Sequence, residues 1–488
     1  MKKMLRAKSA LRLFLLFALC LSPFALARAQ SATATLSGTI TDERGAVVPG
    51  ATVTATSPAT GLQRQATTSG DGTFSIPLLP PAAYTLLVEQ QGFATAKLDD
   101  VILNVNDNRT LNIQLKVGQI GGETVTVSAD ANAIQETPEV ATIVDRQFVA
   151  NLPLNGRSFQ SLIELTPGVV VTPATGGEQG QFSVNGQRAN TNYFTVDGVS
   201  ANVGASAGPL GQSGSGSLPG LSASGGTNNL VSVDALQEFN IQTSTYAPEF
   251  GRSPGAQVSI VTRSGTNDFH GSVFEYLRND ALDANDWFNN SRRLPKPPLR
   301  QNDFGGVLGG PLYLPRFGEG GPTFNSGKNR SFFFFSYEGL RLLQPQTLIT
   351  PLPSEATRRS APTQLQPILN AFPRPNGPDL GGGLAEFSAT YSDPTTLNAT
   401  SIRLDHRVSD NLTFFGRYNY APSSTRTRGL IGSANNITDA QFKTQTLTGG
   451  VTWIVTPRIS NDLRLNWSKN EAGSVLTLDD FGGAIPPP

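Results

Sequence analysis

The sequence has few of the residues that build disulfides, metal centres and most active sites. Its 488 residues include 1 cysteine, 2 histidines and 2 methionines. A zinc site needs several His, Cys or acidic ligands held together, and neither His270 nor His406 has such a set or a nucleophile beside it. We therefore expect no enzyme activity, no metal and no cofactor.

An excess of either charge and a long internal apolar run are also missing. Lysine and arginine total 37, and aspartate and glutamate also total 37. A nucleic-acid partner would require a basic face, so we expect none. Beyond the first residues no apolar stretch is long enough for a membrane helix, so a membrane-spanning chain of this kind must form a closed β-barrel.

The chain begins with the pattern of an export signal. Five positive residues accompany the apolar run at residues 13–21, and Ala27-Arg28-Ala29 fits the small-residue cleavage rule. Nine apolar residues are too few to cross about 30 Å of hydrocarbon. We expect residues 1–29 to be removed. Cys20 lies in this run, and because Leu19 before it does not fit a lipoprotein signal, the mature chain should contain no cysteine.

Residues 30–117 have the pattern of a small β-sandwich. Short alternating runs are separated by turn signals, among them residues 42–45 and 70–72. The order of elements resembles the carboxypeptidase regulatory-like (prealbumin-like) domain, and the match is carried by GTITD at 38–42, VPGATV at 48–53, TSGDGTF at 68–74 and GF at 92–93. Related sandwiches bind sugars, so glycan contact is one reading of this domain. We favour a spacer or docking module.

Residues 130–265 carry the most specific series of motifs in the chain. They read LPLNGRSF at 152–159, LTPGV at 165–169, FSVNGQR at 182–188, FTVDGV at 194–199, EFGR at 249–252 and GAQVSIVTRSGT at 255–266. This order resembles the plug domain of TonB-dependent outer-membrane receptors of the Oar-like branch. Asp197-Gly198 suits a tight turn between two short strands.

Three arginines of this region are candidates for plug–barrel ion pairs. Arg157, Arg188 and Arg252 would be costly inside a barrel lumen unless paired with carboxylates or water. The resemblance implies that plug arginines meet carboxylates of the barrel wall. For any one of the three, a solvated surface position is the alternative. The tract from Ala201 to Asn229, rich in Gly, Ser and Ala, is expected to be a mobile plug loop.

Residues 118–129 form a linker between the two domains. A glycine pair precedes a short β-prone segment made of Glu123, Thr124, Val125, Thr126 and Val127. From the residues alone, this segment is equally the first strand of the next domain. Its position in the resembled family implies a TonB box, which would bind TonB, the energising protein of the inner membrane, by adding a strand to its sheet.

Residues 266–488 alternate in the manner of outer-membrane barrel strands. Ile402, Leu404 and Val408 oppose Arg403, Asp405 and Arg407, and similar patterns follow at 412–420, 447–453 and 463–467. A soluble sandwich also alternates, but rarely with so many aromatic residues beside short turns. Segments 279–327 and 342–398, rich in Pro and Gly, are expected to be long extracellular loops.

The predicted fold is therefore mainly β: a prealbumin-like sandwich, an α+β plug, and an incomplete antiparallel transmembrane barrel. A large plugged barrel needs about 22 strands, so we expect this sequence to be an N-terminal fragment. The expected location is the outer membrane of a Gram-negative-type bacterium, in contact with its lipid, with the sandwich in the periplasm. The expected function is plug-gated, TonB-driven movement of an unidentified extracellular substrate, glycans included. The alternative is a surface or adhesion protein that uses the barrel as an anchor.

Overall fold

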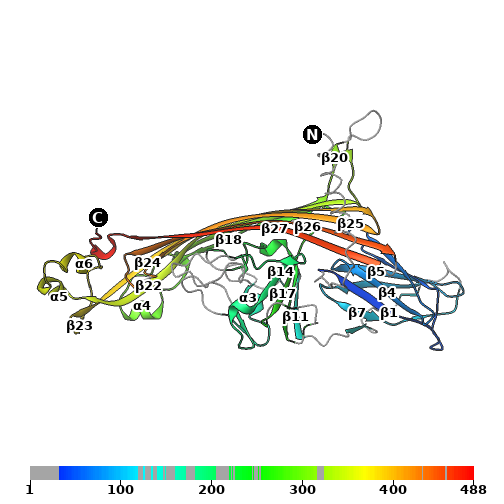
Figure 1. Cartoon of the computed structure of the whole chain (residues 1–488), viewed down its shortest axis with the longest axis horizontal. Helices are drawn as coiled ribbons and strands as arrows, with labels where there is room; N and C mark the ends of the chain where they lie inside the picture. Colours follow the sequence, from blue (N-terminus) through cyan, green and yellow to red (C-terminus); the bar gives the residue numbers. More distant parts are fainter. Residues whose placement is uncertain are drawn as a thin grey trace, which may run out of the picture.

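The protein consists of three β-structures: a sandwich, a plug and one long sheet along which the other two lie. The computed structural model describes residues 32–118, 182–204, 226–244, 254–315, 324–430, 432–456 and 459–487, with shorter stretches at 125–126, 133–135, 140–146, 160–171, 219–220 and 222–223 and single residues 149, 246 and 251. The expected export signal and Cys20 lie outside the described residues. In Figure 1 the long sheet extends over a blue sandwich at one end and a green plug beneath its middle.

The first structure is a β-sandwich made of two five-stranded sheets. One sheet has the order β10-β7-β1-β4, with β8 also paired to β1, and the other has the order β3-β2-β5-β6-β9. The strands are β1 (Ala34–Asp42), β2 (Thr52–Thr56), β3 (Gln63–Thr67), β4 (Thr73–Leu79), β5 (Ala82–Glu89), β6 (Ala96–Leu103), β7 (Asn108–Leu111), β8 (Ile113–Leu115), β9 (Val125–Thr126) and β10 (Ala133–Gln135).

Alternation along these strands places every second side chain in a shared core. Leu36, Val53, Leu86 and Val101 are fully buried there, as expected when one face of each sheet packs against the other. Gly38 is required where β1 passes β7, because a Cβ at this position would meet the carbonyl oxygen of Leu111 at 1.8 Å. The predicted sandwich is confirmed.

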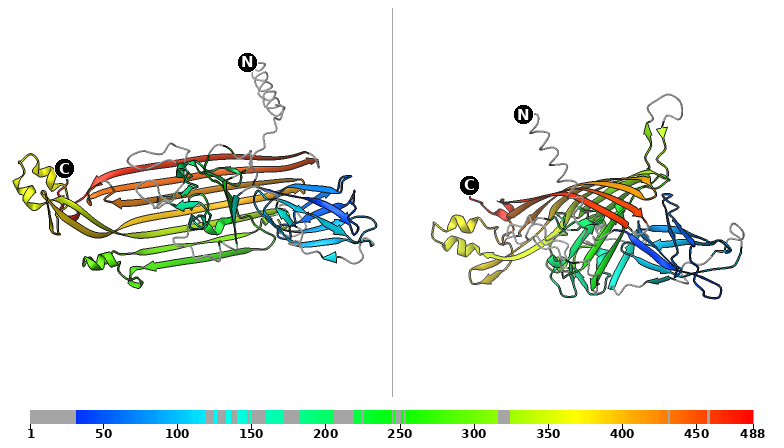
Figure 2. Two further views of the ribbon diagram at one scale, coloured as in Figure 1. Left: turned by 90° about the horizontal axis from the view of Figure 1, so that it is seen from below. Right: turned by 45° about the vertical axis from the view of Figure 1, so that its right-hand side comes forward.

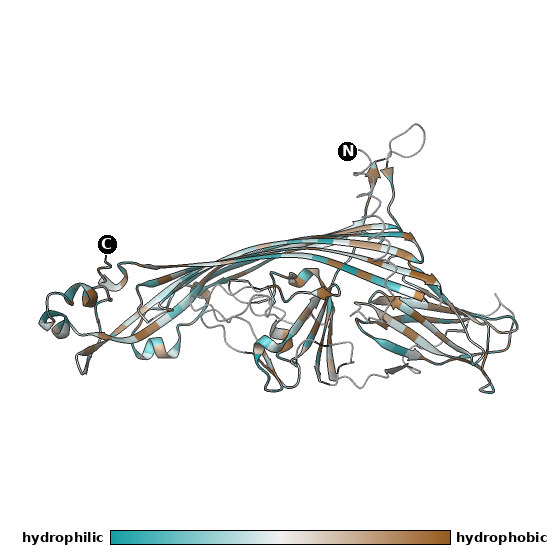
Figure 3. Cartoon of the chain, in the orientation of Figure 1, coloured by the Kyte–Doolittle hydropathy of each residue, from teal (hydrophilic) through white to brown (hydrophobic). Residues whose placement is uncertain are grey.

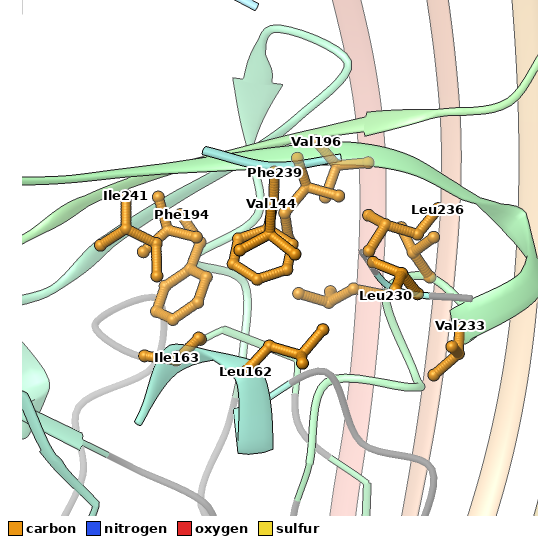
Figure 4. Packing of buried hydrophobic residues seen from close by; sticks show 14 of the residues in the cluster. Val144, Leu162, Ile163, Phe194, Val196, Leu230, Val233, Leu236, Phe239 and Ile241 are labelled. Carbon is orange, nitrogen blue, oxygen red and sulfur yellow. The ribbon is translucent and has the colours of Figure 1, made fainter. Parts of the chain in front are cut away.

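The plug contains a five-stranded sheet of its own and a short helix. The sheet order is β11-β16-β17-β14-β15, and β12 and β13 form a separate hairpin. The elements are β11 (Val140–Asp145), α3 (Gln160–Ile163), β12 (Val169–Val171), β13 (Phe182–Val184), β14 (Tyr193–Val196), β15 (Val199–Ser200), β16 (Leu236–Ser244) and β17 (Gln257–Thr262). Figure 4 shows Leu162 and Ile163 of α3 facing Phe194, Phe239 and the other apolar side chains of this sheet.

The third structure, called the wall here, is an antiparallel sheet of eight strands. Its order is β18-β19-β22-β24-β25-β26-β27, with the short β23 paired to β24. The strands are β18 (His270–Asn279), β19 (Arg300–Pro311), β22 (Ser331–Pro353), β23 (Asp379–Gly381), β24 (Leu384–Ser409), β25 (Leu412–Arg428), β26 (Asn436–Thr456) and β27 (Ile459–Leu478). Consecutive strands are neighbours, as in an up-and-down barrel, and Figure 2 shows the sheet curving over the plug.

The two faces of the wall have opposite character. Ile402, Leu404, Leu465 and Trp467 are exposed on the outer face, whereas polar residues such as Arg417 are buried on the side of the plug. Figure 3 shows apolar and polar residues alternating along the wall strands. The predicted pattern of polar residues inside and apolar residues outside is confirmed. No helix among the described residues is long and apolar enough to cross a membrane.

The predicted long loops are partly wrong. The segment 279–327 contains β19, and its later part, with the hairpin of β20 (Leu314–Pro315) and β21 (Phe324–Asn325), lies at the end of the wall nearest the sandwich. The segment 342–398 contains the extended arms of β22 and β24, which pair from Ser331↔His406 to Pro353↔Leu384. The remaining helices lie in connections at the far end of the wall: α4 (Trp287–Ser291), α5 (Glu355–Ser360) and α6 (Gln366–Asn370).

Candidate functional site: the contact between plug and wall

The turn between β14 and β15 brings a carboxylate to the wall. Asp197 and Gly198 both have positive φ, 51° and 81°, which is the geometry of a two-residue hairpin turn and explains the preference for Asp-Gly. The Asp197 side chain is 3% exposed. Its carboxylate accepts hydrogen bonds from the backbone nitrogen of Thr262 at 2.9 Å and from the Thr262 hydroxyl at 2.9 and 3.0 Å.

An arginine of the wall completes the partners of this carboxylate. Arg403 of β24 donates to Asp197 at 3.1 Å through its Nη1. The same guanidinium donates to Asp405 through Nε and Nη2 at 2.9–3.2 Å. It also lies 4.6 Å from the centre of the Phe415 ring, as in a cation–π contact. One cation thus bridges a carboxylate of the plug and a carboxylate of the wall, and we call Asp197, Thr262, Arg403 and Asp405 the latch.

Further polar groups surround the latch on the inner face of the wall. The guanidinium carbon of Arg464 of β27 lies 4.8 Å from the centre of the same Phe415 ring, and its Nη2 pairs with Asp462 at 2.9 Å. Desolvated charges of this kind are stable only when paired and hydrogen-bonded. Arg464 and Asp462 both belong to β27, so this pair balances charge within the wall beside the latch.

A second contact is made by the plug segment that precedes β16. Arg417 of β25 donates to the carbonyl of Leu230 at 2.6 Å, and Asn419 donates to the carbonyl of Asn229 at 2.8 Å. Asn228 donates to Glu338 of β22 at 2.5 Å. These bonds connect the backbone and side chains of one plug segment to two wall strands, β22 and β25.

This second contact corrects the prediction of a mobile loop for the described residues from 219 to 229, whereas residues 205–218 of that tract lie outside the described residues. The described residues of that tract from 219 onward are buried, and the backbone nitrogen of Ala223 donates to Ser423 at 2.9 Å. The Gly-, Ser- and Ala-rich composition is typical of mobile segments. Small side chains instead allow the backbone to approach the wall closely.

The predicted ion-pair arginines are placed differently from expectation. Arg157 and Arg252 lie outside the described residues. Arg188 is exposed beside a short 3₁₀ turn, and no carboxylate in the described part of the chain pairs with it. At the latch the carboxylate belongs to the plug and the arginine to the wall, which is the reverse of the predicted polarity. The alternation of Ile402, Arg403 and Leu404 placed Arg403 on the inner face, but nothing in the sequence pointed to its partner.

Of the predicted TonB box, the structure describes the backbone of Val125 and Thr126. These residues form β9, which pairs in parallel with Ala96 and Lys97 of β6. Glu123, Thr124 and Val127 lie outside the described residues. Val125 and Thr126 therefore form an edge strand of the sandwich.

The sandwich also contacts both other structures, and the side chain of Asn106 donates to Ser259 of the plug at 3.3 Å. The carbonyl of Gly61 accepts a hydrogen bond from Arg407 of the wall at 2.6 Å, and that of Ala59 accepts one from the backbone nitrogen of Asn267 at 2.8 Å. A cavity of about 360 Å³ lies where sandwich, plug and wall meet, and Tyr84, Arg263 and Arg403 are among its lining residues. Burial lowers the pKa of Arg263 to about 10. No group of three or more His, Cys, Asp or Glu suited to a metal occurs among the described residues.

Three family models match the chain in the order of its three structures. Residues 35–116 match the carboxypeptidase regulatory-like domain, residues 133–257 match the TonB-dependent receptor plug domain, and residues 261–367 and 359–484 match an outer membrane β-barrel domain. The TonB-dependent transporter Oar of Myxococcus xanthus is 31% identical over 279 residues. That alignment covers 53% of this chain and 23% of Oar, so the chain matches about a quarter of the length of this relative.

Solved structures of outer-membrane proteins are also similar. The outer membrane transporter YddB of Escherichia coli has a TM-score of 0.44 and 12% identity, covering 67% of this chain and 38% of its own. The ferric enterobactin receptor PfeA of Pseudomonas aeruginosa, in complex with enterobactin, has a TM-score of 0.37 and 12% identity, covering 70% of this chain and 47% of its own.

Proposed function

We propose that this chain, which belongs to the TonB-dependent receptors and carries an N-terminal carboxypeptidase regulatory-like domain, serves a protein that moves a substrate across the outer membrane under control of its plug. The chain is an outer-membrane protein with its sandwich in the periplasm. In this proposal, TonB binds the segment Glu123 to Val127 and supplies the force that displaces the plug.

The latch is the observation that carries this proposal. A gate must be held in place at rest and must still be movable. A plug packed on the wall through an apolar core would be hard to withdraw, because its apolar surface would have to be exposed to water. Two wall side chains, Val307 and Phe334, do join the apolar core of the plug. Asp197, Arg403 and Asp405 add hydrogen-bonded ion pairs to this contact, which water can replace one at a time as the plug moves.

The most direct test of the gate is Asp197→Ala in the full-length protein. This change removes the plug carboxylate while leaving Arg403 paired with Asp405. We expect the contact between plug and wall to weaken by about 2–4 kcal/mol and the outer membrane to admit more of a large antibiotic. Growth inhibition by that antibiotic is the measurement. Arg188→Ala, in an exposed plug residue, is the matched control and should leave inhibition unchanged.

Deletion of residues 123–127 tests the energy source separately. We expect the deletion to abolish transport of any substrate whose uptake depends on this protein, while leaving its amount in the outer membrane unchanged. Transport that continued at the wild-type rate would overturn the role of TonB. Loss of cell adhesion without any change in transport would instead favour an anchored surface protein.

A further inference from the structure

The cavity between sandwich, plug and wall has the size and position of a small-molecule site. Its volume is about 360 Å³, and sites for small molecules measure about 300–1,000 Å³, lie preferentially between domains and combine an apolar lining with a few polar groups. The sandwich contributes the apolar residues Leu62, Pro80 and Pro81 and the ring of Tyr84. The hydroxyl of Tyr84 is engaged, since it donates to the carbonyl of Pro80 at 2.7 Å.

The plug contributes Arg263, a cation without a carboxylate partner in the described part of the chain. Its Nη1 donates to the backbone carbonyl of Asp234 at 3.2 Å, and its guanidinium carbon lies 4.8 Å from the centre of the Phe334 ring. The carboxylate of Asp234 pairs with Arg146 instead, at 3.3 Å. Two arginines thus lie beside one carboxylate. Because a guanidinium has several N–H donors, Arg263 can bind a further acceptor.

Burial makes the charge of Arg263 costly. It lowers the pKa of Arg263 to about 10, and the neighbouring Arg146 acts in the same direction. A buried cation is stable when a nearby anion compensates its charge and accepts its hydrogen bonds. An anion in the cavity would supply the negative charge that the described side chains around Arg263 do not.

The wall adds a second donor to the same cavity. Nε of Arg464 is buried and has no hydrogen-bond partner among the described residues, although Nη2 pairs with Asp462 at 2.9 Å. Arg403 also lines the cavity, but its guanidinium and the carboxylates of Asp197 and Asp405 bind one another in the latch. The charged groups that retain unused hydrogen-bonding capacity towards a ligand are therefore cationic.

We propose that this cavity binds a small organic anion, with a carboxylate or phosphate group on Arg263 and an apolar body against Leu62 and Pro81. Hydrogen bonds from a guanidinium to a carboxylate or phosphate are charge-assisted and frequently bidentate. Because the lining comes from all three structures, the bound anion stabilises their assembled arrangement. The site shares no residue with the segment 123–127, so this proposal does not depend on how the plug is driven.

Saturation-transfer NMR of the purified full-length receptor in a non-ionic detergent tests the site. The probes are benzoate and phenyl phosphate, and benzamide is a neutral comparison of nearly the same shape as benzoate. We expect at least one anion to bind with a Kd on the order of 1 mM. Benzamide should bind about tenfold more weakly than benzoate, because it lacks the charge-assisted hydrogen bond. The tighter of the two anions identifies the preferred group.

Substitution of Arg263 tests the cationic side of the cavity. Arg263→Gln should weaken binding of the anions about tenfold or more, whereas Arg263→Lys keeps the charge and should retain part of the affinity. Arg188→Gln, in an exposed arginine of the same plug, is the matched control and should bind as the wild type does. The amount of each variant recovered from the outer membrane shows whether it has folded.

A substitution in the sandwich tests the apolar side independently. Ala83 lines the cavity and is exposed, so the ring of Ala83→Phe would occupy the space of the ligand and should abolish binding of the probes. Ala46→Phe is the control, because Ala46 is exposed in a turn of the same sandwich and does not line the cavity.

The outcomes decide between an anion site and a cavity without this function. Loss of binding in Arg263→Gln and Ala83→Phe, with both controls unchanged, supports the proposal. The proposal is overturned if neither anion binds at millimolar concentrations, if benzamide binds as well as benzoate, or if both variants bind as the wild type does. None of these results bears on residues 123–127, so failure here leaves the proposed function in place.

Discussion

The sandwich and the wall are built from the same alternating sequence pattern, with opposite results. In the sandwich the apolar side chains meet between two sheets, and Leu86 is 0% exposed. In the wall they face outward, and Leu465 is 66% exposed while polar residues are buried against the plug. The period of two fixes which residues share a face, but the solvent on each side fixes which face is apolar. The difference shows that the wall is folded for lipid outside and a polar interior.

The largest expected difference between the two regions concerns loss of an apolar side chain. Leu86→Ala leaves a cavity in a close-packed core and should destabilise the sandwich by about 3 kcal/mol. Leu465→Ala should cost less, because lipid can fill the space and no cavity remains. Hydrogen exchange of the sandwich strands, followed in the full-length protein, measures the first effect, and urea unfolding in lipid vesicles measures the second. Equal losses would contradict a lipid-filled outer face.

A charged side chain should separate the regions in the opposite direction. Leu465→Arg puts a cation on the outer face of the wall and should cost about 2–4 kcal/mol near the middle of a bilayer. Ile102→Arg places the same cation on an exposed position of the sandwich, where substitutions usually change stability by about 0.5 kcal/mol or less. Folding yields into vesicles provide the comparison. A wall that tolerated arginine as well as the sandwich does would not be facing lipid.

The smallest expected effect is a pH response that belongs to the sandwich. Burial raises the pKa of Asp107 above its ordinary value, although Asn104 donates hydrogen bonds to this carboxylate. The folded state then holds the proton more tightly than the unfolded state, so stability falls as the pH rises from the ordinary pKa of an aspartate to the raised one, and is constant above it. Asp107→Asn should remove this slope. Amide exchange of β6 and β7 measured across acidic pH tests it, and an unchanged slope in the variant would assign the response to another group.

The sequence predicted the faces of the wall better than the lengths of its strands. The Pro- and Gly-rich composition after Leu342 predicts a loop, and proline lacks the N–H that a sheet requires. Pairing of β22 with β19 ends at Leu343, whereas its pairing with β24 continues to Pro353. Pro345, Pro351 and Pro353 therefore lie where one side of β22 has no strand partner in the described part of the chain, and a missing donor costs little there.

The site was less accessible to sequence reasoning than the fold. The Asp-Gly pair indicated a tight turn, and the alternation around Arg403 indicated an inward side chain. Their contact joins residues 206 positions apart, and no local pattern carries that information. The family resemblance implied ion pairs between plug and wall. It did not identify the residues of the latch, nor that the carboxylate belongs to the plug and the arginine to the wall, because both depend on where the strands lie in space.

The contact between Arg407 and Gly61 has a consequence for the order of assembly. The two residues are 346 positions apart in the chain. Paired strands of the sandwich are much closer in sequence: even in the pairing of β1 with β8, Ile40 lies opposite Ile113. Contacts between near neighbours in sequence form quickly and distant ones late. The sandwich should therefore be folded while β24 and β25 are still being inserted, and its docking on Arg407, near the end of β24, should be among the last steps of biogenesis. A receptor whose wall has not been completed would leave the sandwich undocked in the periplasm, where proteases that act on exposed linkers could remove it.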